Sequence, residues 1–195
     1  MIIFFVMLLV GVGLIFVGCQ ATRSGYESAP YKVVRADGKF ELRDYPSLAV
    51  VETPMATSGN SDDGSFMRLF RFITGANEGK QKIAMTTPVF MSGNDTNRTM
   101  AFVLPAKLNA TTAPKPADSA VTVRELPGGR FAVLRFSGGR SAKHEAAALA
   151  KLESWITAQG LKVLSPPAYG YFDPPWTPTF MRRNEVMLRT KPGKN

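Results

Sequence analysis

The order of the predicted secondary-structure elements repeats once along the chain, and this repetition restricts the fold more than any other feature. Each half reads as two short strands, one helix and two further strands, separated by turns rich in glycine and proline. Because the helices do not alternate with single strands, a doubly wound parallel sheet is excluded. The pattern predicts an α+β fold whose antiparallel sheet curves toward a barrel with the helices packed against it. The strands are expected at residues 39–45, 48–57, 83–91, 100–104, 121–125, 131–136, 168–172 and 183–189.

Both predicted helices have an apolar stripe and recognisable ends. The first is expected over residues 66–74, with Gly75 as its C-terminal cap. The second is expected to run from a Ser141 cap to Gln159. The predicted buried stripe of the first helix, at spacings of three and four residues, consists of Phe66, Leu69, Phe70 and Ile73.

The N-terminal segment is uncharged and apolar over residues 2–18. This length suits the apolar region of an export signal better than a membrane span. Small residues before the lone Cys19 resemble the bacterial lipoprotein signal, in which that cysteine is lipidated; an uncleaved membrane anchor is the alternative. Both alternatives place the domain outside the cytoplasm and tied to a membrane, as a periplasmic or cell-envelope lipoprotein if the source is bacterial. The expected divisions are a signal or anchor at 1–19, a flexible tether at 20–29, a folded domain at 30–190 and a tail at 191–195.

Charge and residue counts exclude several classes of site. The net charge of +9 comes from scattered basic residues, without a block of five like charges or a nucleic-acid-binding signature, so no nucleic-acid partner is expected. One cysteine cannot form a disulfide framework or a cysteine-based metal site, and one histidine excludes a multi-histidine site.

Catalytic motifs do not emerge from the sequence. It contains no GxSxG motif, no phosphate-binding loop, no Ser-His-Asp set and no paired carboxylates at a telling spacing. A single histidine and a cysteine predicted to be lipidated leave few nucleophiles and bases. The sequence therefore favours a binding protein over an enzyme.

Seven segments of the sequence, among them KIAMTTPV at residues 82–89 and RRNEV at residues 182–186, resemble motifs of the SOUL/haem-binding-protein family. They occur in the order of the family and extend over about residues 30–190, and the segments KIAMTTPV and RRNEV are the most specific. The resemblance implies two strand–strand–helix–strand–strand repeats that form a distorted eight-stranded antiparallel barrel flanked by two helices. It also implies binding of haem or a related tetrapyrrole. The matching segments are 31–34, 40–46, 75–77, 82–89, 136–138, 169–175 and 182–186.

The same resemblance implies an apolar cleft beside the first helix. There Met67 and Phe72 would line the face of the macrocycle, and Arg68 or Arg71 would pair with a propionate. The only histidine, His144, falls in the first turn of the second helix, where we expect it to be exposed, so the axial ligand stays open.

Near the C-terminus, Arg183 and Glu185 alternate with Asn184 and Val186 along the last strand. We expect Arg183 to form a structural ion pair, with Glu185 as the candidate partner, or to bind backbone carbonyl groups, and we expect neither residue to be catalytic.

The resulting functional hypothesis is a membrane-tethered, extracytoplasmic carrier or buffer of haem that binds without catalysis. Its expected partners are haem or porphyrin, and a membrane reached through lipidated Cys19 or the N-terminal apolar segment. Two alternatives remain open. One is a module for small apolar ligands or for protein interaction, without haem, and the other is a haem-modifying enzyme.

Overall fold

The computed structural model describes residues 25–56, 63–93 and 97–191. Within these ranges the chain forms two α-helices, two short 3-10 helices and twelve strands. The first half contains β1 (Glu27–Ser28), β2 (Lys32–Asp37), β3 (Phe40–Tyr45), β4 (Leu48–Pro54), α2 (Ser65–Ile73), η1 (Glu78–Lys80), β5 (Thr86–Thr87), β6 (Val89–Ser92) and β7 (Thr99–Val103). The second half contains β8 (Thr122–Leu126), β9 (Gly129–Phe136), α3 (Ala142–Ala158), β10 (Lys162–Val163), β11 (Ala168–Tyr171), η2 (Thr179–Met181) and β12 (Asn184–Lys191).

The predicted export signal or anchor at residues 1–19 lies outside the described residues, as does most of the tether. None of the helices in the described ranges is long and apolar enough to span a bilayer.

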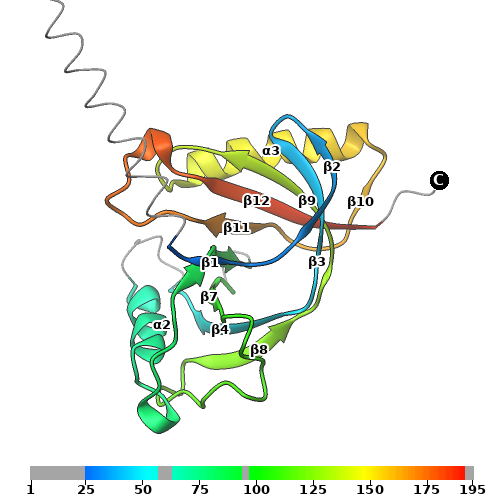
Figure 1. The fold of residues 1–195 in the computed structure, drawn as a ribbon. Helices are drawn as coiled ribbons and strands as arrows, with labels where there is room; N and C mark the ends of the chain where they lie inside the picture. Colours follow the sequence, from blue (N-terminus) through cyan, green and yellow to red (C-terminus); the bar gives the residue numbers. More distant parts are fainter. Residues whose placement is uncertain (1–24, 57–62, 94–96, 192–195) are drawn as a thin grey trace, which may run out of the picture.

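Ten strands form one antiparallel sheet in the order β2-β3-β9-β12-β11-β6-β7-β4-β8, with β10 paired to β12. Figure 1 shows this sheet strongly curled into a half-barrel, with β9 and β12 on one side of the curl and β4 and β8 on the other. β1 and β5 form a separate parallel pair. The predicted α+β class with a curved antiparallel sheet is therefore confirmed. The count of eight strands is not, because β2 and β10 extend the sheet within the described residues.

Each half of the chain gives its first long strand to the other half. β3 pairs with β9 from Phe40–Leu134 to Tyr45–Gly129, so a first-half strand extends the β9-β12-β11 group of the second half. Likewise β8 pairs with β4 and extends the β6-β7-β4 group of the first half. The two groups join where β11 pairs with β6.

The core has three apolar clusters, two under the helices and one inside the curl. α3 packs Leu152 and Ile156 against the outer face of β9 and β12. α2 packs Leu69 and Phe72 against β4 and β7. The cluster inside the curl includes Val50, Phe90, Val133 and Met187.

The rotation of α2 about its axis differs from the prediction. Leu69 and Ile73 are buried as expected, but Phe72 takes the third buried position, while Phe66 and Phe70 are exposed. Apolar residues cover more than half of the circumference of this helix, so its periodicity admits two overlapping faces about 60° apart. Packing against β4 and β7 selects the face that contains Phe72.

Candidate ligand-binding site

The concave face of the sheet is built by alternation along its strands. On β12, Val186 and Leu188 pack under α3, so Glu185, Met187 and Arg189 point into the curl. The concave face thus carries a charged residue, an apolar residue and a second charged residue in succession. Two different environments form around the two charged ends.

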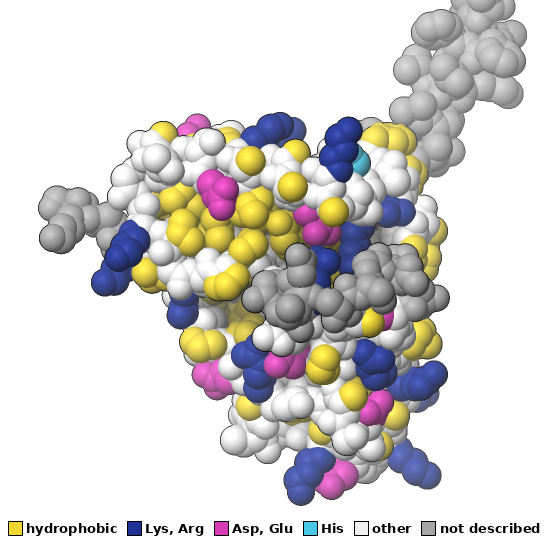
Figure 2. Space-filling view, turned by 180° about the vertical axis from the view of Figure 1, so that it is seen from behind, with side chains coloured by type: hydrophobic (Ala, Val, Ile, Leu, Met, Phe, Trp, Pro, Cys, Tyr) yellow, Lys and Arg dark blue, Asp and Glu magenta, His cyan; other side chains and the backbone are white. Residues whose placement is uncertain are grey.

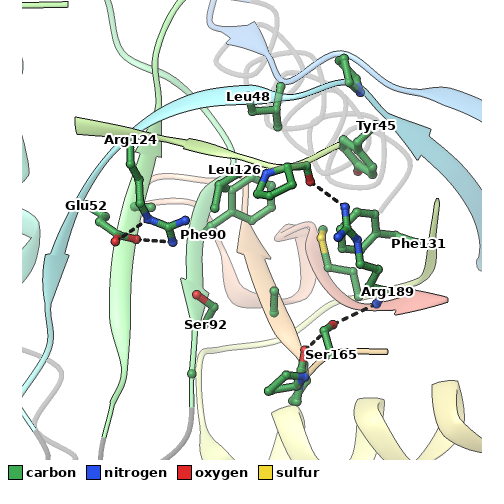
Figure 3. Close-up of a pocket in the computed structure, with 18 residues that line it drawn as sticks. Tyr45, Leu48, Glu52, Phe90, Ser92, Arg124, Leu126, Phe131, Ser165 and Arg189 are labelled. Carbon is green, nitrogen blue, oxygen red and sulfur yellow. Dashed lines mark hydrogen bonds and ion pairs between the residues drawn. The ribbon is translucent and has the colours of Figure 1, made fainter. Parts of the chain in front are cut away.

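A pocket of about 350 Å³ opens at the Arg189 end (Figure 3). Its lining is mainly apolar and comes from both halves of the chain. Leu48 and Phe90 belong to the first half, and Leu126, Phe131 and Met187 to the second. This composition is typical of a ligand pocket, in which a few polar groups orient an otherwise apolar molecule.

The charged groups of this pocket lie on opposite sides, as Figure 3 shows. On one side Arg124 donates two hydrogen bonds to Glu52, at 2.5 and 2.7 Å, so this pair is neutral. On the other side Arg189 donates through Nη2 to the carbonyl oxygens of Pro127 and Gly128. None of the ion pairs found in residues 25–56, 63–93 and 97–191 includes Arg189.

Two glycines let the turn before β9 close around Arg189. A Cβ atom on Gly129, which has φ of +154°, would lie 2.6 Å from the Arg189 Nη2 atom. A Cβ atom on Gly128 would lie 2.6 Å from the carbonyl oxygen of Tyr45. Side chains at either position would therefore displace the guanidinium group or separate the two turns.

A buried ion cluster occupies the other end of the concave face. Both Arg43 and Glu185 have fully buried side chains, and two hydrogen bonds of 2.7 and 3.0 Å join them. Arg43 Nε also contacts Glu41 Oε2 at 2.6 Å, and Arg43 Nη1 donates to the Tyr45 hydroxyl at 3.0 Å. The predicted ion pair between Arg183 and Glu185 is present at 2.6 Å.

The surroundings of this cluster set the pKa values of its members. Burial alone would raise the pKa of the Glu185 carboxyl, but hydrogen bonds and charges from Arg43 and Arg183 hold that pKa below its ordinary value. Burial raises the pKa of Tyr45, which reaches both the cluster and the pocket, to about 12. Glu185 is therefore ionised and Tyr45 protonated at neutral pH, so the cluster is a stable structural unit.

The residues predicted to bind haem do not share one surface. Met67 and Arg71 are exposed on α2, beside Phe66 and Phe70. Phe72 is only 1% exposed and belongs to the apolar cluster that packs α2 against the sheet, so it does not face a ligand on the helix surface. Arg68 is engaged by protein groups: it donates to the Thr53 hydroxyl at 3.0 Å and to the carbonyl oxygens of Asp63 and Pro54 at 3.3 and 2.7 Å.

His144 is exposed at the start of α3, as expected, and Figure 2 shows it on the surface beside a basic side chain. Its Nδ1 atom lies 2.8 Å from the carbonyl oxygen of Gly139, and its backbone N–H donates to Ser141, the predicted cap. Among the described residues, no group of three or more histidine, cysteine or acidic side chains could hold a metal ion.

Sequence reasoning missed the pocket because its lining comes from segments between Tyr45 and Arg189 that share no motif. One signal was present. Glu185, Met187 and Arg189 occupy alternate positions on the last strand and so point to the same face, and charges at inward positions of a strand need a partner or a ligand.

Solved structures share this fold at low sequence identity. The C-terminal domain of EcmrR aligns with a TM-score of 0.58 and 13% identity, covering 83% of this chain and 98% of that one. A hydrolase from Listeria innocua aligns with a TM-score of 0.59 and 11% identity, covering 81% of this chain and 94% of that one. The structure of EcmrR in a complex with DNA aligns with a TM-score of 0.56 and 13% identity, covering 78% of this chain and 57% of that one. At such identities the likeness shows the fold alone.

Family membership follows from the sequence itself. No curated protein matches the chain significantly. The model of the family described as "SOUL heme-binding protein" matches residues 26–189, which is most of the chain and includes every motif noted above. The resemblance seen in those motifs is thereby confirmed, and the chain belongs to the SOUL heme-binding protein family.

Proposed function

We propose that this protein binds haem or a related tetrapyrrole without catalysis, as a carrier or buffer, on the outer face of α2. The observation that carries the proposal is an exposed apolar surface on a short helix. Phe66, Met67 and Phe70 are 42%, 44% and 39% exposed. The rings of Phe66 and Phe70 stack at 6.0 Å with an interplanar angle of 14°, and so offer a flat surface.

The chemistry of this face suits a tetrapyrrole. The macrocycle is flat and apolar, and aromatic rings pack favourably against such a surface. Met67 adds a thioether, a group that ligates haem iron in some proteins. Arg71, one turn beyond Met67, has no side-chain partner among the described residues and is placed to pair with a propionate. Arg68 instead holds α2 to β4 through the hydrogen bonds given above, so Arg71 is the better candidate for that contact.

A haem titration of the full-length protein in detergent tests the proposal, with micelles alone as the blank. We expect a saturable shift of the Soret band at micromolar haem. Arg71→Glu should weaken binding about tenfold, because a like charge then faces the propionates. Lys151→Glu is the matched control, since it makes the same charge reversal on the exposed side of α3.

Three results would count against this function. Absence of a Soret shift, with an intact fold by circular dichroism, would remove haem as the ligand. Equal affinity of Arg71→Glu and the unaltered protein would remove α2 as the site. Turnover of haem in the presence of a reductant would replace the carrier with a haem-modifying enzyme.

The proposal includes a membrane tether through the N-terminal segment, with Cys19 lipidated and the domain outside the cytoplasm. The uncharged run at residues 2–18 supports it. So do Trp176 and Phe180, which are 74% and 73% exposed, because aromatic side chains of this kind favour the membrane interface. Mass spectrometry of the mature N-terminus should find acylated Cys19, and the Cys19→Ser variant should lack this modification. An N-terminus that begins elsewhere would contradict the lipoprotein form of the tether.

A further inference from the structure

The pocket inside the curl has a composition that the tetrapyrrole proposal does not use. It lies on the concave face of the sheet, whereas α2 packs on the outer side of β4 and β7. Its volume of about 350 Å³ is near the lower end of the range for ligand pockets, roughly 300 to 1,000 Å³. The pocket therefore suits a small molecule that enters end first between the two groups of strands.

The charge inside the pocket does not balance. Arg124 and Glu52 neutralise each other, which leaves the positive charge of Arg189 without a carboxylate in the described part of the chain. Only Nη2 of Arg189 donates to protein carbonyls there, so Nε and Nη1 remain as donors. Of these, Nε shares its edge with Nη2 and that edge faces Gly129, so Nη1 is left to donate a charge-assisted hydrogen bond to one oxygen atom of a carboxylate.

The position of this guanidinium group is fixed by its surroundings. Its Cζ atom lies 5.5 Å from the centre of the Phe131 ring. The carbonyl oxygens of Pro127 and Gly128 hold Nη2, and Gly129 supplies the space that the group occupies. The Arg189 backbone N–H donates to the Ser165 hydroxyl at 3.2 Å, which joins this strand to the other wall of the pocket. Little side-chain freedom remains to be lost when a ligand binds.

From these observations we propose that the pocket is a second binding site, independent of α2, for a small apolar monocarboxylate. Arg189 receives the carboxylate, and the tail lies against Leu48, Phe90, Leu126 and Met187. A single unbalanced positive charge selects one negative group, and the mainly apolar lining excludes strongly polar molecules. The neutral Arg124–Glu52 pair borders the opposite side and offers no net positive charge to a second negative group.

The test uses the full-length protein in detergent, with 4-phenylbutyrate and its uncharged counterpart 4-phenylbutanol as probes. Isothermal titration calorimetry should show that the carboxylate binds at least about tenfold more tightly than the alcohol, because it alone forms an ion pair with the guanidinium group. Arg189→Gln should abolish this difference. Arg130→Gln is the matched control. Arg130 precedes Phe131, the β9 partner of Arg189, but it pairs with Asp44 at 2.8 Å and does not line the pocket.

A second variant tests the location without removing the charge. Ala168→Phe should fill the pocket and abolish binding of both probes, with circular dichroism and urea unfolding used to confirm that the variant folds. If Ala168→Phe does not fold, protection of Arg189 from phenylglyoxal by 4-phenylbutyrate gives the same information in the unaltered protein. No protection, or no binding of 4-phenylbutyrate to the unaltered protein, would overturn the proposal.

The two proposed sites can fail separately. Arg71→Glu should leave the affinity for 4-phenylbutyrate unchanged, and Arg189→Gln should leave the affinity for haem unchanged. Competition between haem and 4-phenylbutyrate would show that one site serves both ligands, and would overturn the independence proposed here.

Discussion

Arg43 and Arg189 both belong to the concave face of the curled sheet, yet their surroundings differ. Arg43 is fully buried and contacts two carboxylates, those of Glu41 and Glu185. Arg189 is half-buried, contacts backbone carbonyl oxygens and borders an apolar pocket. A buried charge with its full set of partners holds strands together, whereas a held charge without a counter-ion is available to a ligand. The same residue type thus has two roles, set by its neighbours.

The largest loss of stability should follow from breaking the buried ion pair between Arg43 and Glu185. Glu185→Gln would remove one carboxylate from three buried or partly buried arginines, Arg43, Arg135 and Arg183. We expect a loss of about 3 to 5 kcal/mol in the free energy of unfolding, because the fully buried Arg43 would lose one of its two carboxylate partners and keep only Glu41. Urea denaturation measures it.

The control for this experiment is Glu52→Gln, which breaks the partly exposed pair with Arg124. That loss should stay near or below about 1 kcal/mol. Equal losses in the two variants would mean that burial of the Arg43 cluster has no energetic consequence.

A smaller effect should appear in the pH dependence of stability. The pKa of Glu185 lies below its ordinary value of 4.5 in the folded protein, so the unfolded chain binds more protons between those two values. The stabilisation from this carboxylate is therefore present above pH 4.5 and is lost as the pH falls through the folded pKa. Urea midpoints measured from pH 7 to pH 3 should fall less steeply for Glu185→Gln than for the unaltered protein. Parallel curves would contradict the assignment.

Replacement of Arg189 should destabilise the protein less than Glu185→Gln does. Arg189→Met should lower the free energy of unfolding by about 1 to 2 kcal/mol, the scale of hydrogen bonds from a charged donor to carbonyl groups. Thermal or urea unfolding gives the value. A loss as large as that of Glu185→Gln would make Arg189 a structural residue like Arg43 and would remove the contrast between them.

Sequence patterns predicted the elements whose causes are local. The Ser141 cap and the span of α3 follow from neighbouring residues, and the Arg183–Glu185 pair follows from alternation on one strand. The buried face of α2 was not predicted correctly, because its apolar residues permit two rotations and only contact with β4 and β7 decides between them.

The candidate site was harder to predict for the same reason. The partner of Glu185 is Arg43, which is 142 positions away in the sequence. The pocket forms only when the turn around Tyr45 meets the turn around Gly128. No periodicity within one segment contains information about such contacts, because they arise from the order of strands in the sheet. The family motifs supplied the fold class but did not identify Arg189.

The exchange of β3 and β8 between the two halves has a consequence for the integrity of the chain. A single cleavage in the connection between β7 and β8, residues 104–121, would leave an N-terminal piece that holds β2 and β3 of the β9-β12-β11 group and a C-terminal piece that holds β8 of the β6-β7-β4 group. Neither piece could close its own hydrogen-bond ladder without exposing an edge. The nicked protein would then behave as an obligate heterodimer, whose apparent stability rises with concentration as that of separate subunits does.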